Sequence, residues 1–166
     1  MSAPEIAIRP AVDRDLPALG RLGATLVRVH HAFDQARFMA PAPDVEAGYA
    51  WFLGTQLAQP EVVILVADHL GEVVGYVYAG LEPQSWKELR EAAGFVHDVV
   101  VAEDFRGQGI AARLTEAAIA WLYQQGAPRV MLWSAAQNAG AQRLFARLGF
   151  RRTMVEMTRE KDGEQS

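Results

Sequence analysis

The stretch Asp104-Phe-Arg-Gly-Gln-Gly-Ile-Ala111 joins two segments of different hydrophobic period. It follows a strand-like apolar run, Phe95–Val101, and opens into a segment of helical period that begins at Ile110. Two close glycines at such a junction favour a phosphate site, because the first amide groups of a helix have no partner within it. The alternative is a strand-to-helix turn that simply requires glycine. The pattern leaves both interpretations open.

Two common nucleotide motifs do not fit this stretch. A P-loop requires GxxxxGK[ST], and no Lys-Ser or Lys-Thr follows either glycine. Gly107, Gly109 and Ala112 satisfy GxGxxA, but a dinucleotide site also needs an acidic residue about 20 positions later, at the end of the next strand. That strand ends in Leu132-Trp-Ser134, without a carboxylate. We therefore reject both nucleotide sites.

Length and composition are those of an ordinary globular chain. The 166 residues are 51% hydrophobic and 22% charged, so we expect a single domain over residues 1–166, with 162–166 as a frayed tail. The net charge of −4, without a basic tail, disfavours nucleic acid as the main partner. The chain has no cysteine, which excludes disulfides, thiolate metal sites and a cysteine nucleophile.

The sequence shows neither a secretory signal nor a membrane span. The start, MSAPEIAIRP, lacks a basic region followed by an apolar stretch. The most apolar long segment, from Ile110 to Tyr123, is interrupted by Arg113 and Glu116. We therefore expect a cytoplasmic protein without a membrane partner.

The hydrophobic pattern predicts strands and helices in the order β-α-α-β-β-β-α-β-α-β, an α/β fold. The expected strands are Glu5–Arg9, Val62–Ala67, Val73–Ala79, Phe95–Val101, Arg129–Trp133 and Phe150–Glu160. The expected helices are Leu16–Val29, Asp44–Leu57, Ile110 to about Gly126 and Asn138–Leu148, with a short one around Trp86–Arg90.

Several of these segments resemble one known family. Arg106-Gly-Gln-Gly-Ile-Ala111 is similar to the R/Q-x-x-G-x-G/A signature of the GCN5-related N-acetyltransferases (GNAT). Ile8–Pro17 resembles the family's first strand and helix, and Asn138–Phe150 resembles its last helix and turn. The resemblance covers nearly the whole chain. It implies a mixed, largely antiparallel and splayed central sheet flanked by helices.

The same resemblance implies a reaction and its co-substrate. The family moves the acetyl group of acetyl-CoA to a primary amine of a small molecule, amino acid or peptide by direct attack, without a metal. By position, the coenzyme pyrophosphate would bind the backbone amides of Arg106, Gly107, Gln108, Gly109, Ile110 and Ala111. Val99 and Val101 would pair with the pantetheine arm, and the Val99 amide would polarise the thioester carbonyl. Asn138 corresponds to a position near the coenzyme, and a plain helix cap is its alternative role.

Acetylation of an amine also requires proton transfer. Many relatives carry a carboxylate or histidine nine residues before the motif arginine, and His97 occupies that position here. An imidazole titrates near neutrality, which suits a general base. Asp98 is expected on the opposite face of the strand. The family commonly has a tyrosine as general acid where this chain has Phe145, so Tyr76, Tyr78, Ser134 or solvent would have to replace it.

The substrate side is less defined by the sequence. In this fold the first two helices, their connection and the loop before the central strand usually form it, and here these segments contain His30, His31, Asp34, Arg37, Phe38, Trp86, Lys87, Glu88 and Arg90. The absent tyrosine motivates a second hypothesis, a non-catalytic acetyl-CoA-binding sensor or interaction module. Transfer of a longer acyl chain is a more distant one. A homodimer is compatible with the resemblance, because dimers are common among similar proteins.

Overall fold

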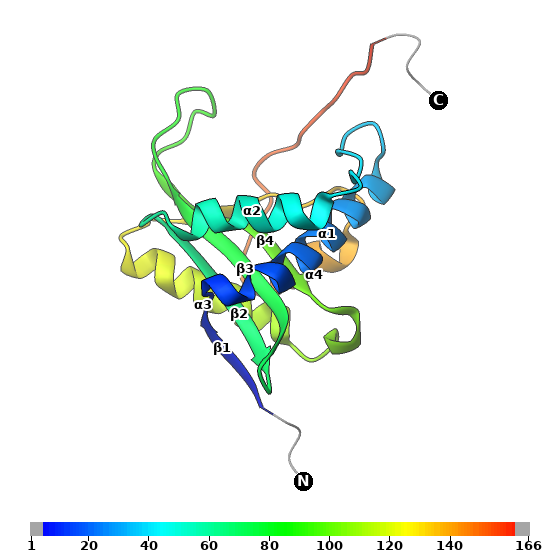
Figure 1. Ribbon diagram of the computed structural model, residues 1–166. Helices are drawn as coiled ribbons and strands as arrows, with labels where there is room; N and C mark the ends of the chain where they lie inside the picture. The colour runs from blue at the N-terminus through cyan, green and yellow to red at the C-terminus, as the bar shows by residue number, and fades with distance from the viewer. Residues whose placement is uncertain (1–4, 162–166) are drawn as a thin grey trace.

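The computed structural model of the protein describes residues 5–161, and it has one five-stranded sheet at its centre (Figure 1). The strands are β1 (Ile6–Pro10), β2 (Val62–His69), β3 (Glu72–Glu82), β4 (Ala93–Val101) and β5 (Val130–Leu132). They lie in sequence order across the sheet. Strands β1 to β4 pair antiparallel with their neighbours, and only β4 and β5 run parallel. This is the mixed, largely antiparallel sheet that the sequence predicts.

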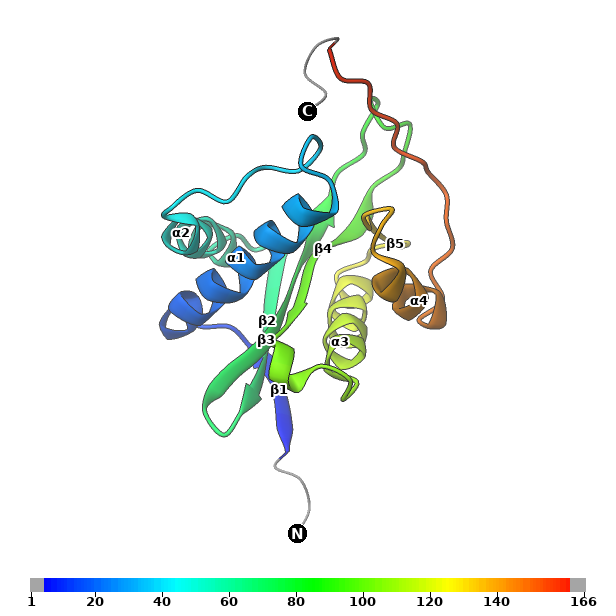
Figure 2. The same cartoon turned by 90° about the vertical axis from the view of Figure 1, so that its right-hand side faces the viewer.

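Helices cover both faces of the sheet. They are α1 (Leu16–Phe33), α2 (Val45–Leu57), α3 (Ile110–Gln124) and α4 (Ala139–Arg147). Figure 2 shows α1 and α2 on one side of the sheet and α3 and α4 on the other. One cluster of buried side chains lies between the sheet and α3, and a second lies between the sheet and α1. Strand β4 contributes to both clusters because alternate side chains point to opposite faces.

Two glycines of α1 determine how close α2 lies. A Cβ atom at Gly20 would overlap the backbone carbonyl of Glu46, and one at Gly23 would overlap the ring of Tyr49. The two helices can therefore pack with the Tyr49 ring directly against the α1 backbone. This contact directs the Tyr49 hydroxyl toward the sheet, where it reaches Asp98 on β4.

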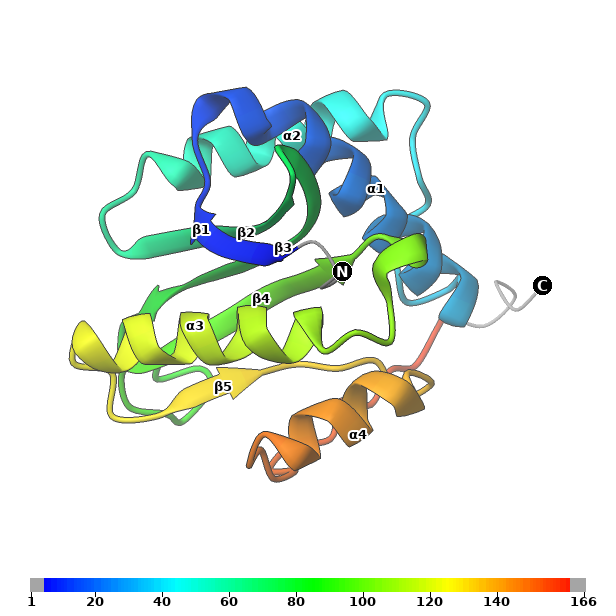
Figure 3. The same cartoon turned by 90° about the horizontal axis from the view of Figure 1, so that it is seen from below.

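The two strands that form the parallel pair differ in length. Strand β4 has nine residues and β5 has three, so β5 pairs only with Gly94, Phe95 and Val96. Within the described residues, β4 has no strand neighbour on that side from His97 to Val101. Figure 3 shows α3 running along β4, on the face of the sheet opposite α1 and α2.

A β-bulge interrupts the other side of β4. Tyr78 pairs with Asp98, and the next residue of β3, Ala79, pairs with Val96, so His97 has no opposite residue. A bulge changes the face of the sheet toward which the following side chains point, and bulges are frequent next to active sites. This irregularity changes which residues of β4 share a face.

Two sequence-based predictions fail at this level, and one cannot be compared. Residues Phe150–Glu160 form no strand, because the segment pairs with no other strand in the described part of the chain. No helix forms around Trp86–Arg90, where instead an isolated bridge joins Ser85 and Arg90. The predicted frayed tail, 162–166, lies outside the described residues.

The close packing of α1 and α2 can be tested at Gly20. We expect Gly20→Ala to lower the free energy of unfolding by about 1–3 kcal/mol, because the added methyl group overlaps backbone rather than a flexible side chain. Urea denaturation measures the difference.

The matched control is Gly48→Ala in the first turn of α2, where a Cβ atom meets nothing within 4 Å. Because alanine is the better helix former, this variant should be unchanged or more stable by about 0.5–1 kcal/mol. Equal losses in both variants would show that α1 and α2 do not depend on this contact.

Candidate functional site

The open edge of β4 presents unpaired backbone groups. The Ala102 amide donates to Val74 O of β3 at 2.8 Å. Because amide groups alternate between the two edges of a strand, the amides of Val99 and Val101 point the other way, to the side that β5 does not reach. An extended ligand can therefore add to β4 as a strand would, by backbone hydrogen bonds.

A run of free amide groups continues from this edge. Gly107 and Gly109 have positive φ angles of 78° and 76°, and Gly109 is the N-cap of α3. The Arg113 amide, which donates to Gly109 O at 3.1 Å, is the first amide of the helix with a backbone acceptor. In the described part of the chain, none of the amides of residues 107–112 donates a hydrogen bond to protein. Such a nest at a helix N-terminus is suited to an anion, because the helix dipole is positive there.

The space around the nest explains the glycines. A Cβ atom at either Gly107 or Gly109 would meet no protein atom within 4 Å. Packing within the protein therefore does not require glycine at either position. The positive φ angles do require it, and the missing side chains leave the amide groups open to a ligand.

Arg106 and Asn138 use their polar groups within the protein. The Arg106 amide donates to Glu103 O at 3.2 Å, and its Nε donates to Val101 O at 3.1 Å. Arg106 thus connects the nest to the β4 edge through its side chain, while its own amide is already paired. The Asn138 Oδ1 accepts from the Ala141 amide at 3.1 Å, which makes this residue the N-cap of α4. Its side-chain NH₂ group retains two donors.

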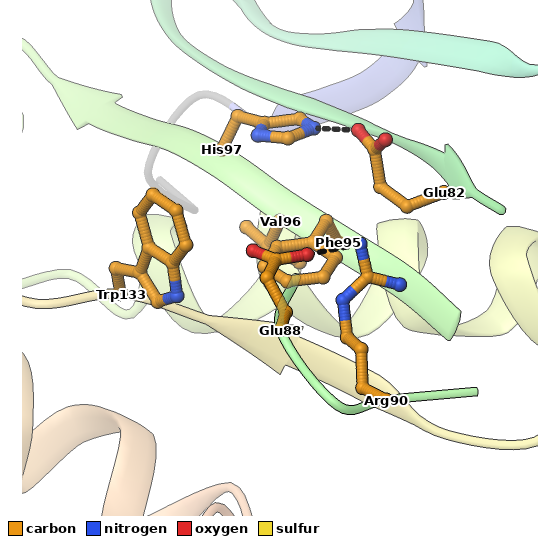
Figure 4. Close-up of a pocket in the computed structure, with 7 residues that line it drawn as sticks. All are labelled: Glu82, Glu88, Arg90, Phe95, Val96, His97 and Trp133. Carbon is orange, nitrogen blue, oxygen red and sulfur yellow. Dashed lines mark ion pairs between the residues drawn. The ribbon is translucent and has the colours of Figure 1, made fainter. Parts of the chain in front are cut away.

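A pocket opens beside the first half of β4. Figure 4 shows its lining, which comes from β3, β4, the loop that connects them and the residue after β5: Glu82, Glu88, Arg90, Phe95, Val96, His97 and Trp133. Its volume is about 230 Å³. The bulge residue His97 therefore stands between this pocket and the open edge of β4.

Three side chains contact the His97 ring. Its Nε2 lies 3.2 Å from Glu82 Oε1, and its ring stacks on Phe95 with 5.8 Å between centroids (Figure 4). The centroid of the Tyr78 ring lies 4.8 Å away. If Nε2 carries the proton that Glu82 accepts, Nδ1 carries the lone pair and can act as a base.

Arg90 maintains the shape of the same pocket. Its guanidinium group donates to Pro83 O at 2.9 Å, pairs with Glu88 at 2.6 Å and lies 5.1 Å over the Phe95 ring. These contacts fix the connection between β3 and β4. Glu88 is thereby neutralised by Arg90, which leaves Glu82 as the acidic group that faces His97.

The prediction that Asp98 lies on the opposite face from His97 is wrong. His97 contacts Tyr78, and Asp98 accepts from the Tyr76 hydroxyl at 2.9 Å and the Tyr49 hydroxyl at 2.5 Å. Tyr76 and Tyr78 both belong to the cluster beneath α1, so both β4 residues lie toward that face. The bulge at His97 breaks the simple alternation on which the prediction depended.

Burial raises the pKa of Asp98 above its ordinary value, and the hydroxyls of Tyr49 and Tyr76, which donate to the carboxylate, oppose that rise. Burial and the nearby Asp98 charge in turn raise the pKa of Tyr49 and of Tyr76. The same two causes raise the pKa of Tyr78 to about 12. These three hydroxyls are therefore poor acids at neutral pH.

Phe145 and the two tyrosines that could replace the missing acid have different surroundings. Phe145 packs edge-to-face on Phe150, with 5.9 Å between ring centroids. Tyr76 donates to Asp98, and Tyr78 donates to Gln56 Oε1 at 2.8 Å. Of these, only Tyr78 contacts the His97 ring.

The substrate-side residues lie in three different places. Glu88 and Arg90 line the pocket. The His30 ring instead packs against Phe38, and His31 Nδ1 contacts Phe38 O at 3.1 Å, so these side chains hold the connection between α1 and α2. Trp86 is almost fully exposed at the tip of the loop between β3 and β4.

Comparison with known proteins identifies the family. The model of the acetyltransferase (GNAT) family matches residues 26–150, which include β4, the nest and the pocket. The chain belongs to the GNAT family. The prediction from the Arg106–Ala111 signature is therefore confirmed.

Curated relatives share part of their length with this GNAT chain. An uncharacterised N-acetyltransferase of Methanocaldococcus jannaschii is 34% identical over 60% of this chain and 44% of its own. The L-methionine sulfoximine/L-methionine sulfone acetyltransferase of Pseudomonas aeruginosa is 32% identical over 64% of this chain and 60% of its own. The chain thus spans less than two thirds of the length of either relative.

A solved structure confirms the GNAT fold. The aminoglycoside N-acetyltransferase AAC(6')-Iy, in complex with CoA, superposes with a TM-score of 0.76 over 97% of both chains at 18% identity. At this identity the likeness concerns the fold alone.

Sequence reasoning missed Glu82 and Tyr49 as members of the site. Glu82 lies beyond the predicted strand Val73–Ala79, and Tyr49 lies on a helix without an amphipathic pattern, so neither residue stood in a motif. The pairing of β3 with β4 carries Glu82 to His97, and the glycines of α1 admit Tyr49 to Asp98. The sequence does contain a signal for the contact between Tyr49 and Asp98, because Gly20 and Gly23 lie about one helical turn apart on α1.

Within residues 5–161, no three histidine, aspartate or glutamate side chains are arranged to hold a metal ion. None of the helices there is both long and apolar enough to span a membrane.

The buried carboxylate of Asp98 gives a test by pH. Because its pKa is raised in the folded protein, its contribution to stability is complete below the unfolded pKa of about 4 and is lost as the pH rises through the folded pKa. The Asp98→Asn variant should therefore gain stability relative to the unsubstituted protein between pH 4 and pH 7, as measured by urea denaturation at each pH.

Asp15→Asn is the control of opposite sign. The Arg9 guanidinium lowers the pKa of Asp15, so this carboxylate stabilises the fold above pH 4 and loses its effect as the pH falls. Relative to the unsubstituted protein, Asp15→Asn should lose stability as the pH rises toward neutrality. If the difference in unfolding free energy between Asp98→Asn and the unsubstituted protein did not change with pH, the result would contradict the burial of Asp98 as a charged group.

Proposed function

We propose that the protein transfers the acetyl group of acetyl-CoA to a primary amine. The observation that carries the proposal is the continuous backbone surface formed by the open edge of β4 and the six free amides of residues 107–112. Its two parts match an extended amide chain followed by a pyrophosphate, which is the order of groups in coenzyme A. The binding residues are Val99, Val101, Gly107, Gln108, Gly109, Ile110 and Ala111, with Arg106 contributing through its side chain and Asn138 at the start of α4.

The geometry suits direct attack on the thioester. The amine nitrogen bonds to the carbonyl carbon, the C–S bond breaks, and the coenzyme leaves as a thiolate that takes up a proton. The Val99 amide, on the open edge, donates to the carbonyl oxygen as negative charge develops there. An amide on a paired strand has no torsional freedom, so this donor is already oriented before the reaction begins.

His97 accepts the proton that the attacking amine loses. Its ring stands between the pocket and the Val99 edge, and Glu82 on the neighbouring strand holds its Nε2. Glu82 is therefore a positioning residue, which orients the ring and stabilises the imidazolium that forms. Solvent supplies the proton to the thiolate, because Phe145 carries no acidic group and the hydroxyl of Tyr78 is bonded to Gln56.

We assign the pocket at Glu82 and His97 to the acceptor amine. With Glu88 paired to Arg90, Glu82 leaves the pocket with an acidic group that attracts an ammonium group, and Phe95 and Trp133 supply apolar surface. A volume of about 230 Å³ fits a small molecule, an amino acid or the end of a peptide. The Pseudomonas relative named above acts on modified amino acids by its name, which supports this size class.

One observation favours a second candidate, a sensor that binds acetyl-CoA without turnover. Phe145 packs against Phe150 and leaves the usual acid position without a proton donor. Saturable acetyl-CoA binding, without thiol release across a panel of primary amines, amino acids and peptide N-termini, would favour the sensor over the enzyme.

Coenzyme binding can be tested at Gly109. We expect Gly109→Ala to weaken acetyl-CoA binding at least tenfold in calorimetry, because a side chain at φ 76° strains the nest and covers its amide groups. An affinity equal to that of the unsubstituted protein would remove the nest from the coenzyme site.

Gly126→Ala is the matched control. Gly126 also has a positive φ angle, 94°, and open space around it, but it follows the other end of α3. The Gly126→Ala variant should lose about 1 kcal/mol of unfolding free energy, as Gly109→Ala should, but its acetyl-CoA affinity should be unchanged.

Proton transfer can be tested at His97 and Glu82. We expect His97→Ala to lower kcat/KM by about 10²–10⁴ and to flatten the acid limb of the pH–rate profile, with acetyl-CoA affinity unchanged. Glu82→Gln should cause a smaller loss, about tenfold, and shift that limb. Release of the coenzyme thiol measures the rate.

Glu88→Gln serves as the control for both variants, because Glu88 lines the same pocket but pairs with Arg90. Its pH–rate profile should keep the original shape. Identical profiles for His97→Ala and the unsubstituted protein would exclude His97 as the base.

A further inference from the structure

His97 lies at a point of β4 where neither neighbouring strand pairs with it. On the β3 side, the bulge between Tyr78 and Ala79 leaves His97 without an opposite residue. On the other side, the pairing with β5 ends at Val96. Within residues 5–161, His97 therefore has no strand partner on either side. A base must nevertheless keep its direction, because proton transfer requires hydrogen-bond distance to the amine.

The next side chain along β4 provides an anchor at this point. Asp98 Oδ2 accepts hydrogen bonds from the Tyr49 hydroxyl of α2 at 2.5 Å and from the Tyr76 hydroxyl of β3 at 2.9 Å. Because the two donors belong to different elements, together they fix the position and the direction of the carboxylate. The side chain of Asp98 thus ties β4 to α2 and β3 directly beside the residue that the sheet leaves unpaired.

The two donors are themselves held in place. Tyr76 is fully buried, and the Tyr49 ring packs against the backbone of α1 at Gly23. Helix α2 also contacts the surroundings of His97 by a second route, because Phe52 packs edge-to-face on Tyr78 with 6.0 Å between centroids. The anchor of Asp98 is therefore made of groups that have little freedom to move.

The surroundings of Asp98 favour a positioning role over proton transfer by its own carboxylate. Asp98 is not among the residues that line the pocket beside His97. Its Oδ2 already accepts two hydroxyl groups, and both donors belong to the cluster beneath α1. The side chain therefore acts on the site through the backbone of β4 rather than by touching the acceptor.

We propose that Asp98 is a positioning residue of the acetyl transfer, which holds the bulge of β4 through Tyr49 and Tyr76 so that the His97 ring keeps its direction toward the pocket. The inference rests on the proposed role of His97 as the base. The hydrogen bonds rather than the charge produce the effect, because an oxygen acceptor at this position is enough to hold both hydroxyls.

Two substitutions at position 98 test the proposal. Asp98→Ala removes the acceptor, and we expect kcat to fall about tenfold to a hundredfold, because a small displacement of a catalytic group is costly. The KM for acetyl-CoA should be unchanged, since the nest is intact. Asp98→Asn keeps an oxygen acceptor and should retain most of the kcat. Release of the coenzyme thiol measures the rate, and an Asp98→Asn variant as slow as Asp98→Ala would overturn the proposal.

Tyr49→Phe and Leu53→Val form a matched pair on α2. Tyr49→Phe removes one donor but keeps the ring that packs on Gly23, so kcat should fall by less than in Asp98→Ala. Leu53→Val shortens a fully buried side chain of the same helix and costs about 1 kcal/mol of unfolding free energy, but it should leave kcat unchanged. An equal loss of kcat in both variants would reduce the network to a general structural role and overturn the proposal.

The ring resonances of His97 give a readout that does not require turnover. The Tyr78 and Phe95 rings lie 4.8 and 5.8 Å from the His97 ring between centroids, so they shift its ring protons in NMR spectra. His97→Ala assigns these resonances among those of the four histidines. At a pH of about 8.5, above the ordinary imidazole pKa of about 6.5, they should move in Asp98→Ala and stay in place in Asp98→Asn and Leu53→Val.

The two readouts separate this inference from the proposed function. Unchanged His97 resonances in Asp98→Ala would overturn the positioning role, whether or not the protein acetylates an amine. If the unsubstituted protein released no thiol with any amine, the proposed acetyl transfer would fail, and the ring resonances would still decide whether Asp98 holds His97.

Discussion

The mismatch in length between β4 and β5 is the constraint on which the rest of the structure depends. Nine residues of β4 meet three of β5, so the parallel pairing stops at Val96, and within residues 5–161 the backbone beyond it has no strand partner on that side. A sheet normally satisfies both edges of an interior strand. Here the unsatisfied edge is a permanent groove of donors and acceptors, and it leads directly into the turn before α3. The backbone surface that we propose for the coenzyme follows from that gap, whereas the position of His97 follows from the bulge between β3 and β4.

The face of β4 that packs beneath α1 is closed by buried side chains, in contrast to the open edge. Gly20 and Gly23 let α2 approach α1, Tyr49 then reaches across to Asp98, and Tyr76 completes the pair of donors. A buried carboxylate is costly unless it is hydrogen-bonded, and the two hydroxyls offset part of that cost. The network holds β4 next to the bulge, so it fixes the neighbouring His97 without touching the pocket. Packing beneath α1 thus stabilises the geometry around His97.

Most of the fold could be predicted from local pattern. Four helices and five strands follow from hydrophobic period, and the glycine turn follows from its place between a strand and a helix. The exceptions share one cause. The segment Phe150–Glu160 has a strand pattern, but a strand also needs a partner edge, and none of the described strands lies beside it. The face of Asp98 was misjudged because a bulge depends on the pairing of two strands, which the β4 sequence alone does not contain.

The sequence by itself determined the family and the glycine turn before α3, because glycine spacing and helix position act through the local backbone. Through the resemblance to the family it also marked His97, nine residues before Arg106. Only the tertiary structure decided what surrounds that histidine. Glu82 comes from the adjacent strand, Tyr78 and Phe95 enclose the ring, and Asp98 is buried by a helix that starts about fifty residues earlier. Contacts between distant segments depend on register, bulges and helix approach, and these are set by the packing of the whole chain.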